Sequence, residues 1–112
     1  MITITILRHS AENSRIVSFA IEGHAQFKKP GKDIVCAGVS AISVGTVNAI
    51  EELAGLELPA SMDNGWLQSD IPEQSDPAVN ERVQLLLESM IVMLSTIVAS
   101  YGKFVQIRQQ IR

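Results

Sequence analysis

The sequence has few of the features expected of a secreted or membrane protein. It contains one cysteine in 112 residues, so it has no intramolecular disulfide. No apolar targeting segment precedes the first periodic run, and with the cysteine count this predicts a cytoplasmic protein. Polar residues interrupt the apolar stretches, so we expect no membrane-spanning segment.

Positive charge and aromatic residues are also scarce. Nine Lys and Arg face twelve Asp and Glu, which gives a formal net charge of −3. This is the wrong sign for a broad phosphate-binding surface, so we expect no direct nucleic-acid binding and a basic partner instead. Aromatic residues make up 4% of the chain. Aliphatic side chains must therefore fill the core.

Residues that would hold a metal or a nucleotide lack the required spacing. One cysteine and two histidines, His9 and His24, offer no pair of ligands at the spacing of a zinc site. The segment from Gly23 to Gly31 lacks the Gly-Lys-Ser/Thr ending of a phosphate-binding loop. We therefore predict neither a metal nor a cofactor.

The composition that is present fits one globular domain over residues 1–112. Apolar residues make up 46% and charged residues 19%. Residues 2–7 and 17–21 alternate with a period of two, and the short polar segment between them predicts a hairpin. Residues 56–71 predict a second hairpin, because Asn64-Gly65 is a preferred pair for a tight turn.

Two long helices are predicted between and after these hairpins. Asp33 is a strong N-cap for a helix that Gly55 would end. Asp76 and Pro77 supply the N-cap and the first position of a second helix. Gly102 would end that helix, and a closing strand over 103–108 follows. The helical stripes expected to form the core are Ile34, Val35, Val39, Ile42, Val47, Ile50 and Leu53 in the first helix, and Val79, Val83, Leu86, Met90, Met93, Ile97 and Tyr101 in the second.

The predicted order ββαββαβ indicates an α+β fold. We expect two layers, with a largely antiparallel sheet of about five strands and both helices packed on one of its faces. The second helix is apolar beyond its main stripe, which favours a homodimer.

The chemistry of the chain centres on its cysteine. With Asp33 as N-cap, Cys36 lies in the first helical turn, where free N–H groups and the helix dipole favour a thiolate. His24 precedes it by twelve residues, enough for the loop to fold back and bring imidazole to sulfur as a general base. N–H groups near Cys36 would stabilise an oxyanion. The alternative is a buried structural cysteine, and on the residues alone it is the commoner case.

Other residues near Cys36 also have two interpretations. Asp33 either caps the helix only, or also orients His24 or receives a basic residue of the substrate. Ser40 and Ser43 follow Cys36 on one helix face, where a hydroxyl either contacts the site or packs on the sheet. His9 at the end of the first strand is a fallback for the base.

The motif around these residues resembles a known family. "GHA" at 23–25, Gly31 and "DIVCAGVSA" at 33–41 are similar to the signature of the ribosomal-processing cysteine protease Prp family, formerly a family of unknown function. The similarity extends over essentially the whole chain, including "VNAIEEL" and the leucine-rich second helix.

The resemblance implies a Cys–His endopeptidase. In such an enzyme Cys36 is the nucleophile and His24 the base, with Gly23, Gly31, Asp33 and Ser40 as supporting residues. It also implies a homodimer whose substrate is a bacterial large-subunit ribosomal protein precursor, number twenty-seven, which loses a short N-terminal extension ending near an aromatic pair. The segment "QFKKPGK" would close over the substrate.

Two other classes of function remain open from the sequence. The first is a non-catalytic, ribosome-associated interaction module in which Cys36 is structural. The second is a thiol redox sensor, although the chain has no second cysteine to resolve an oxidised thiol.

Overall fold

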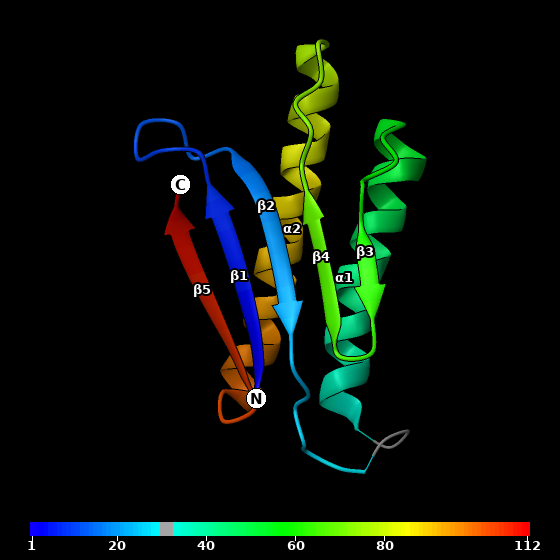
Figure 1. Cartoon of the computed structure of the whole chain (residues 1–112), viewed down its shortest axis with the longest axis vertical. Coiled ribbons are helices and arrows are strands. Elements are labelled where there is room, and N and C mark those ends of the chain that lie inside the picture. The colour runs from blue at the N-terminus through cyan, green and yellow to red at the C-terminus, as the bar shows by residue number, and fades with distance from the viewer. Residues whose placement is uncertain (30–32) are drawn as a thin grey trace.

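A computed structural model describes residues 1–29 and 33–112. Its elements follow the predicted order ββαββαβ (Figure 1). The seven elements are β1 (Ile2–Arg8), β2 (Ile16–Glu22), α1 (Ile34–Ala54), β3 (Ser61–Asp63), β4 (Trp66–Asp70), α2 (Pro77–Tyr101) and β5 (Val105–Ile111).

The strands form one five-stranded sheet in the order β3-β4-β2-β1-β5. Three neighbouring pairs are antiparallel, and β1 pairs with β5 in parallel. The parallel pair requires a crossover, and the α2–β5 segment returns the chain to the outer edge of β1. The sheet is therefore mixed but largely antiparallel, as predicted.

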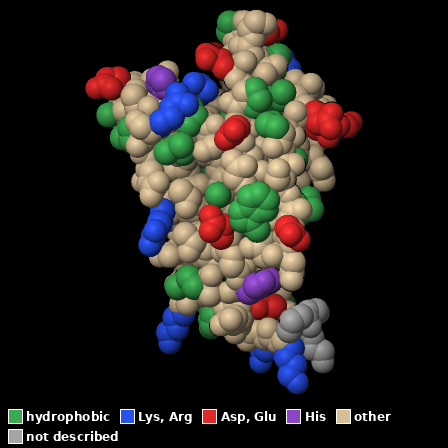
Figure 2. Space-filling model, in the orientation of Figure 1, with side chains coloured by type: hydrophobic (Ala, Val, Ile, Leu, Met, Phe, Trp, Pro, Cys, Tyr) green, Lys and Arg blue, Asp and Glu red, His purple; other side chains and the backbone are tan. Residues whose placement is uncertain are grey.

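Both helices pack on one face of the sheet, and the sheet lies in front of them in Figure 1. Ile4, Ile6 and Phe19 point toward the helices and are almost completely buried. Leu87 and Leu94 of α2 meet them from the other layer. The opposite face of the sheet is open, and Figure 2 shows hydrophobic side chains scattered on it rather than gathered. The prediction of a two-layer α+β fold is confirmed.

The predicted helix ends are confirmed. The Asp33 carboxylate accepts from backbone N–H groups at the start of α1, and Gly55 ends that helix with a left-handed φ of 71°. Asp76 caps α2 with Pro77 in its first turn, and Gly102 follows its last residue. Local capping chemistry is sufficient to place these ends.

The predicted core stripes are partly wrong. In α1, Ile34 and Leu53 are 58% and 61% exposed, whereas Ser43 and Thr46 are buried. The two hydroxyls donate to carbonyls four residues earlier, so burial leaves neither without a partner. In α2 the same error occurs: Met93 is 43% exposed and Leu86 only half-buried, while Leu87, Ile91 and Leu94 are buried.

The second hairpin is shorter than residues 56–71 suggest. Its first arm, β3, has three residues, all exposed, and its second arm, β4, has five. Pro59 precedes β3 and cannot donate to a ladder, which accounts for the late start of that strand.

By length and composition alone, both α1 and α2 are long and apolar enough to cross a membrane, despite the polar residues that interrupt them, but the core helices of soluble proteins pass the same test. In this fold each helix contributes one side to the core that it shares with the sheet.

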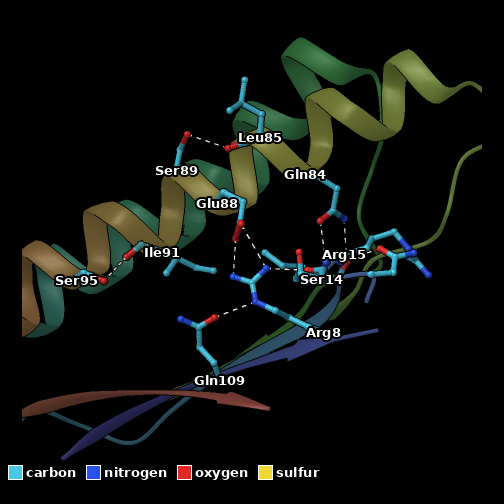
Figure 3. Close-up of polar contacts among 12 residues, drawn as sticks. Arg8, Ser14, Arg15, Gln84, Leu85, Glu88, Ser89, Ile91, Ser95 and Gln109 are labelled. Atoms are coloured by element: carbon cyan, nitrogen blue, oxygen red, sulfur yellow. Dashed lines mark hydrogen bonds and ion pairs between the residues drawn. The ribbon is translucent and has the colours of Figure 1, made fainter. Parts of the chain in front are cut away.

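A polar brace joins α2 to the sheet at one end of the molecule (Figure 3). The Arg8 guanidinium of β1 contacts both carboxylate oxygens of Glu88 on α2, at 2.7 and 3.3 Å. It also donates to Gln109 of β5 at 2.9 Å and to the Ser14 carbonyl at 2.8 Å. The brace fixes one end of the two layers, and the candidate site occupies the other.

Candidate active site

Cys36 lies in the first turn of α1, as predicted, and Asp33 holds that turn in place. One Asp33 oxygen, Oδ1, accepts hydrogen bonds from the backbone N–H groups of Val35 and Cys36, each at 3.0 Å. Cys36 itself is neither fully buried nor fully exposed. The capping side chain therefore fixes the backbone that carries the thiol.

The second Asp33 oxygen, Oδ2, binds the loop that precedes the helix. It accepts from the backbone N–H groups of Phe27 at 3.0 Å and Lys28 at 3.4 Å. Desolvation pushes the pKa of this carboxyl upward, but the hydrogen bonds from Cys36, Lys28 and Phe27 outweigh it and hold the pKa below its ordinary value of 3.8. One ionised carboxylate thus joins the loop to the helix.

An aromatic cluster holds the same loop from the other side. The Phe27 ring meets Tyr101 and Phe104 edge-on, with ring centroids 5.6 and 5.2 Å apart. Tyr101 ends α2, and Phe104 directly precedes β5. The loop is therefore attached both to α1 and to the far side of the core.

His24 follows the end of β2, and a tight turn fixes its backbone. Gly23 has a φ of 94°, and its N–H donates to the Gly65 carbonyl at 2.8 Å. A Cβ on Gly23 would collide with the Met1 carbonyl oxygen, so a side chain does not fit there. The Met1 amino nitrogen donates to the His24 carbonyl at 2.7 Å. The side chain of His24 is exposed.

The fold brings His24 and Cys36 together. The residue after His24 is Ala25, and its backbone N–H donates to Cys36 Sγ at 3.3 Å. His24 and Cys36 also line the same two adjoining hollows. The backbone that follows His24 therefore contacts the Cys36 sulfur.

The two hollows differ in size and in the side chains that line them. The first, called here the apolar hollow, has a volume of about 230 Å³. Besides His24 and Cys36, its walls are mainly apolar, with Ile2, Ile21, Val39, Val44, Met62, Trp66 and Leu67, and also include the polar residues Ser40, Ser43, Asp63 and Asn64. The second, called here the loop hollow, has a volume of about 640 Å³. Its other walls are Gln26, Lys28, Asp33, Ala37 and Asn64. Cys36 lines both hollows and so lies where they adjoin.

The structure describes the two predicted serines near the site but not the predicted Gly31. Ser40 is exposed and lines the apolar hollow, and Ser43 lines it from a buried position with its hydroxyl donating to the Val39 carbonyl. Gly31, and with it part of the segment predicted to close over the substrate, lies outside the described residues.

His9 is wrong as a fallback base. It follows β1 at the end of the sheet away from His24, and its Nδ1 lies 2.9 Å from an Arg112 nitrogen. A seven-residue strand is about 20 Å long, so this imidazole is far from Cys36.

Sequence reasoning missed three residues of the site. Ala25 supplies the N–H at sulfur, Gly65 provides the surface on which the His24 ring lies, and Asn64 lines both hollows. The Asn-Gly turn signal located the latter two in a hairpin, but nothing local connects that hairpin with His24. Among the described residues, no group of three or more His, Cys, Asp or Glu side chains could hold a metal ion.

A thiol in the first turn of a helix, with a histidine lining the same two hollows, fits a cysteine-dependent hydrolase. Comparison with known proteins agrees and narrows the class to cysteine proteases. The family model described as "Cysteine protease Prp" matches residues 1–106. The chain belongs to this family and is a cysteine protease.

Curated relatives and solved structures support the assignment. A ribosomal processing cysteine protease Prp of Bacillus subtilis is 45% identical over 103 residues, which cover 90% of each chain. One from Staphylococcus aureus is 33% identical over 107 residues, covering 96% of this chain and 97% of that one.

Two crystal structures of the S. aureus protease are also similar. The one with a covalently linked product peptide has a TM-score of 0.85 at 31% identity, and covers 97% of this chain and 99% of that one. The one with a substrate peptide has a TM-score of 0.78 at 32% identity and the same coverage.

Proposed function

We propose that this protein is a cytoplasmic endopeptidase that removes the N-terminal extension of a ribosomal protein precursor, large-subunit protein number twenty-seven. The observation that supports it most is the hydrogen bond from the Ala25 N–H to Cys36 Sγ, because Ala25 directly follows His24 in the chain. The names of the relatives, ribosomal processing proteases, support the class of substrate.

Cys36 is the nucleophile and His24 the general base in this proposal. His24 takes the thiol proton as Sγ attacks the scissile carbonyl. The tetrahedral intermediate collapses when the carbon–nitrogen bond breaks, and the imidazolium returns the proton to the leaving amine. Water, activated by His24, then hydrolyses the thioester and restores the thiol.

Two of the predicted supporting residues act through the backbone. Asp33 holds the first turn of α1 and the loop together, and so positions Cys36 relative to His24. Gly23 allows the turn that places His24. Ser40, on the rim of the apolar hollow, offers a hydroxyl to the substrate backbone. Gly31 stays a prediction of the family motif.

The apolar hollow is suited to an aromatic side chain beside the scissile bond. An apolar cavity of about 150 Å³ accepts benzene, and this hollow is larger, at about 230 Å³. Met62 and Trp66 give it a polarisable and an aromatic wall. An extension that ends near an aromatic pair would place one ring there.

The protein also acts as a homodimer in this proposal. Leu85, Val92 and Met93 of α2 are 66%, 68% and 43% exposed. Beside them, an apolar groove between α1 and α2 is lined by Ala41, Ile42, Gly45, Thr46, Ala49, Leu86, Ser89 and Met93. A second copy would cover this surface. Analytical ultracentrifugation should give a dimer for the wild type and a monomer for Val92→Asp, and a wild-type monomer at micromolar concentration would refute it.

The substrate is tested with the full-length precursor. The enzyme should release one N-terminal peptide, identified by mass spectrometry, and should leave a ribosomal protein that lacks the extension uncut. A precursor whose aromatic pair is replaced by two glycines serves as the matched control and should be cut at least tenfold more slowly. Equal cleavage of both precursors, or cleavage at another bond, would refute the assigned substrate.

A further inference from the structure

We infer that the backbone N–H of Ala25 is an oxyanion donor of this protease. The inference rests on the proposed Cys36 nucleophile and adds a catalytic group that the sequence motif does not reveal. In the free enzyme this N–H points at Cys36 Sγ from 3.3 Å. Ala25 is 2% exposed, so its N–H is shielded from water.

The helix N–H groups expected to serve as donors are already engaged. The N–H groups of Val35 and Cys36 both donate to Asp33 Oδ1. The Ala37 N–H donates to the Asp33 carbonyl at 3.0 Å. A group bound in this way cannot turn to an oxyanion without breaking the cap of α1. Within the described part of the chain, Ala25 supplies the backbone N–H that faces the sulfur.

The peptide unit that carries this N–H is fixed at both ends. Its carbonyl belongs to His24 and accepts from the Met1 amino nitrogen at 2.7 Å. Because the peptide is planar and trans, that hydrogen bond directs the N–H on the other side toward Sγ. A donor on the carbonyl also polarises the peptide and strengthens the N–H. The next residue, Gln26, has a φ of 58°, a left-handed conformation that is uncommon for non-glycine residues.

The Ala25 N–H suits this role because negative charge develops on an oxygen beside the sulfur during the reaction. When Sγ bonds to the scissile carbon, the π electrons of the carbonyl move to its oxygen, which becomes an oxyanion adjacent to sulfur. Effective donors lie about 2.7–3.1 Å from that oxygen. An N–H already directed at Sγ can transfer its hydrogen bond from sulfur to the oxyanion with little movement. It then stays in place while the carbon–nitrogen bond breaks and His24 protonates the amine.

The test replaces the Ala25 N–H with an ester oxygen by incorporating lactic acid at that position. This change removes the donor and keeps the side chain. The matched control carries the corresponding ester at Ile71, whose N–H donates to the Val17 carbonyl at 2.9 Å away from the site. Both proteins are compared with wild type in cleavage of the precursor peptide, in inhibition by a peptide aldehyde, and in alkylation by iodoacetamide.

We expect the Ala25 ester to lower kcat about 10²–10³-fold, with KM near that of the control. Binding of the aldehyde, which forms a tetrahedral adduct, should weaken by a similar factor. Alkylation creates no oxyanion, so its rate should change less than tenfold. A kcat within threefold of the control would overturn the inference, as would alkylation that falls in parallel with kcat. If Cys36→Ala cleaved like wild type, the proposed function itself would fail, which is a separate result.

Discussion

The imidazole of His24 lies directly against Gly65, the glycine of the β3–β4 turn. A Cβ built on Gly65 would come within 2.5 Å of His24 Nε2 and 3.0 Å of Cε1. The turn thus leaves the histidine a space that only glycine provides. Gly65 also has a φ of 75°. Glycine is therefore needed here for two reasons: the backbone conformation of the turn, and the space that the His24 ring occupies.

Substitution of this glycine should separate the two requirements. Gly65→Ala should lose about 1 kcal/mol of stability from its backbone conformation and at least tenfold in kcat from displacement of His24. Gly55→Ala is the matched control, because Gly55 has a φ of 71° and open space around it. It should lose similar stability and keep its activity. Denaturant titration and peptide cleavage measure the two effects, and equal activity of both variants would contradict the role of Gly65.

Asp33 offers a second way to separate structure from activity. In Asp33→Asn the amide oxygen can still cap Val35 and Cys36, but its NH₂ faces the donors of Phe27 and Lys28 and repels them. We expect a clear loss of kcat/KM with only part of the loss in thermal stability that Asp33→Ala shows, because the helix cap is kept while the charge and the loop contacts are lost. Asp33→Ala should lose the cap as well.

The control for Asp33 is the cap of the other helix. Asp76→Asn retains the acceptor that Asp76 offers to Ala78 and contacts no loop near the site. It should cut the precursor peptide at the wild-type rate. If Asp33→Asn does so too, its contact with the loop does not matter for catalysis.

The pH dependence of stability follows from the same carboxylate. Its pKa is below 3.8 in the folded protein because the hydrogen bonds it accepts outweigh desolvation. The stabilisation is therefore complete above pH 3.8 and is lost as the pH falls through the lowered value. Urea titration at pH 7 and near pH 3 should show a difference between wild type and Asp33→Ala that shrinks at the lower pH. A constant difference would contradict this assignment.

Phe27 should order the active-site loop by anchoring it to the core. Edge-on aromatic pairs contribute roughly 0.5–1.5 kcal/mol each, so Phe27→Ala should cost about 1–2 kcal/mol or more. It should also speed amide exchange at Ala25 and lower kcat/KM, while Phe27→Leu keeps an apolar anchor and loses less. Unchanged exchange at Ala25 in the alanine variant would show that the ring does not order this backbone.

The sequence allowed most of the fold to be predicted because its signals are local. Asp33, Asp76 and Gly55 define helix ends through bonds within one turn, and Asn64-Gly65 defines its hairpin. The core positions predicted on the helices were less reliable. The Ser43 hydroxyl donates to a carbonyl of its own helix, so this serine can face the core, and hydrophobicity alone does not reveal that.

Only part of the active site could be predicted from the sequence. Cys36 is marked by its place after a capping residue, and the family motif pairs it with His24. Gly65 lies forty-one positions beyond His24, and the two meet only because β4 pairs with β2. The hydrogen bond from Ala25 to sulfur likewise arises from the folded loop. Neither contact has a signature in the chain.

Charge gives a prediction about encounter with the substrate. The chain carries a formal charge of −3, and a ribosomal protein is basic, so attraction should speed their association. Raising the salt concentration should lower kcat/KM and leave kcat unchanged, because screening acts on association. A short neutral peptide with the same cleavage site is the control and should show no such dependence. A salt-independent kcat/KM for the full precursor would remove this role for charge.

Cleavage of the precursor by variants of Cys36 and His24 is the most direct test of the proposed Cys–His dyad. Cys36→Ala and His24→Ala should each cut at least a thousandfold more slowly than wild type. His9→Ala, which changes the other histidine at the far end of the sheet, should cut at the wild-type rate. If Cys36→Ala or His24→Ala cut as fast as His9→Ala, the Cys–His dyad would be wrong.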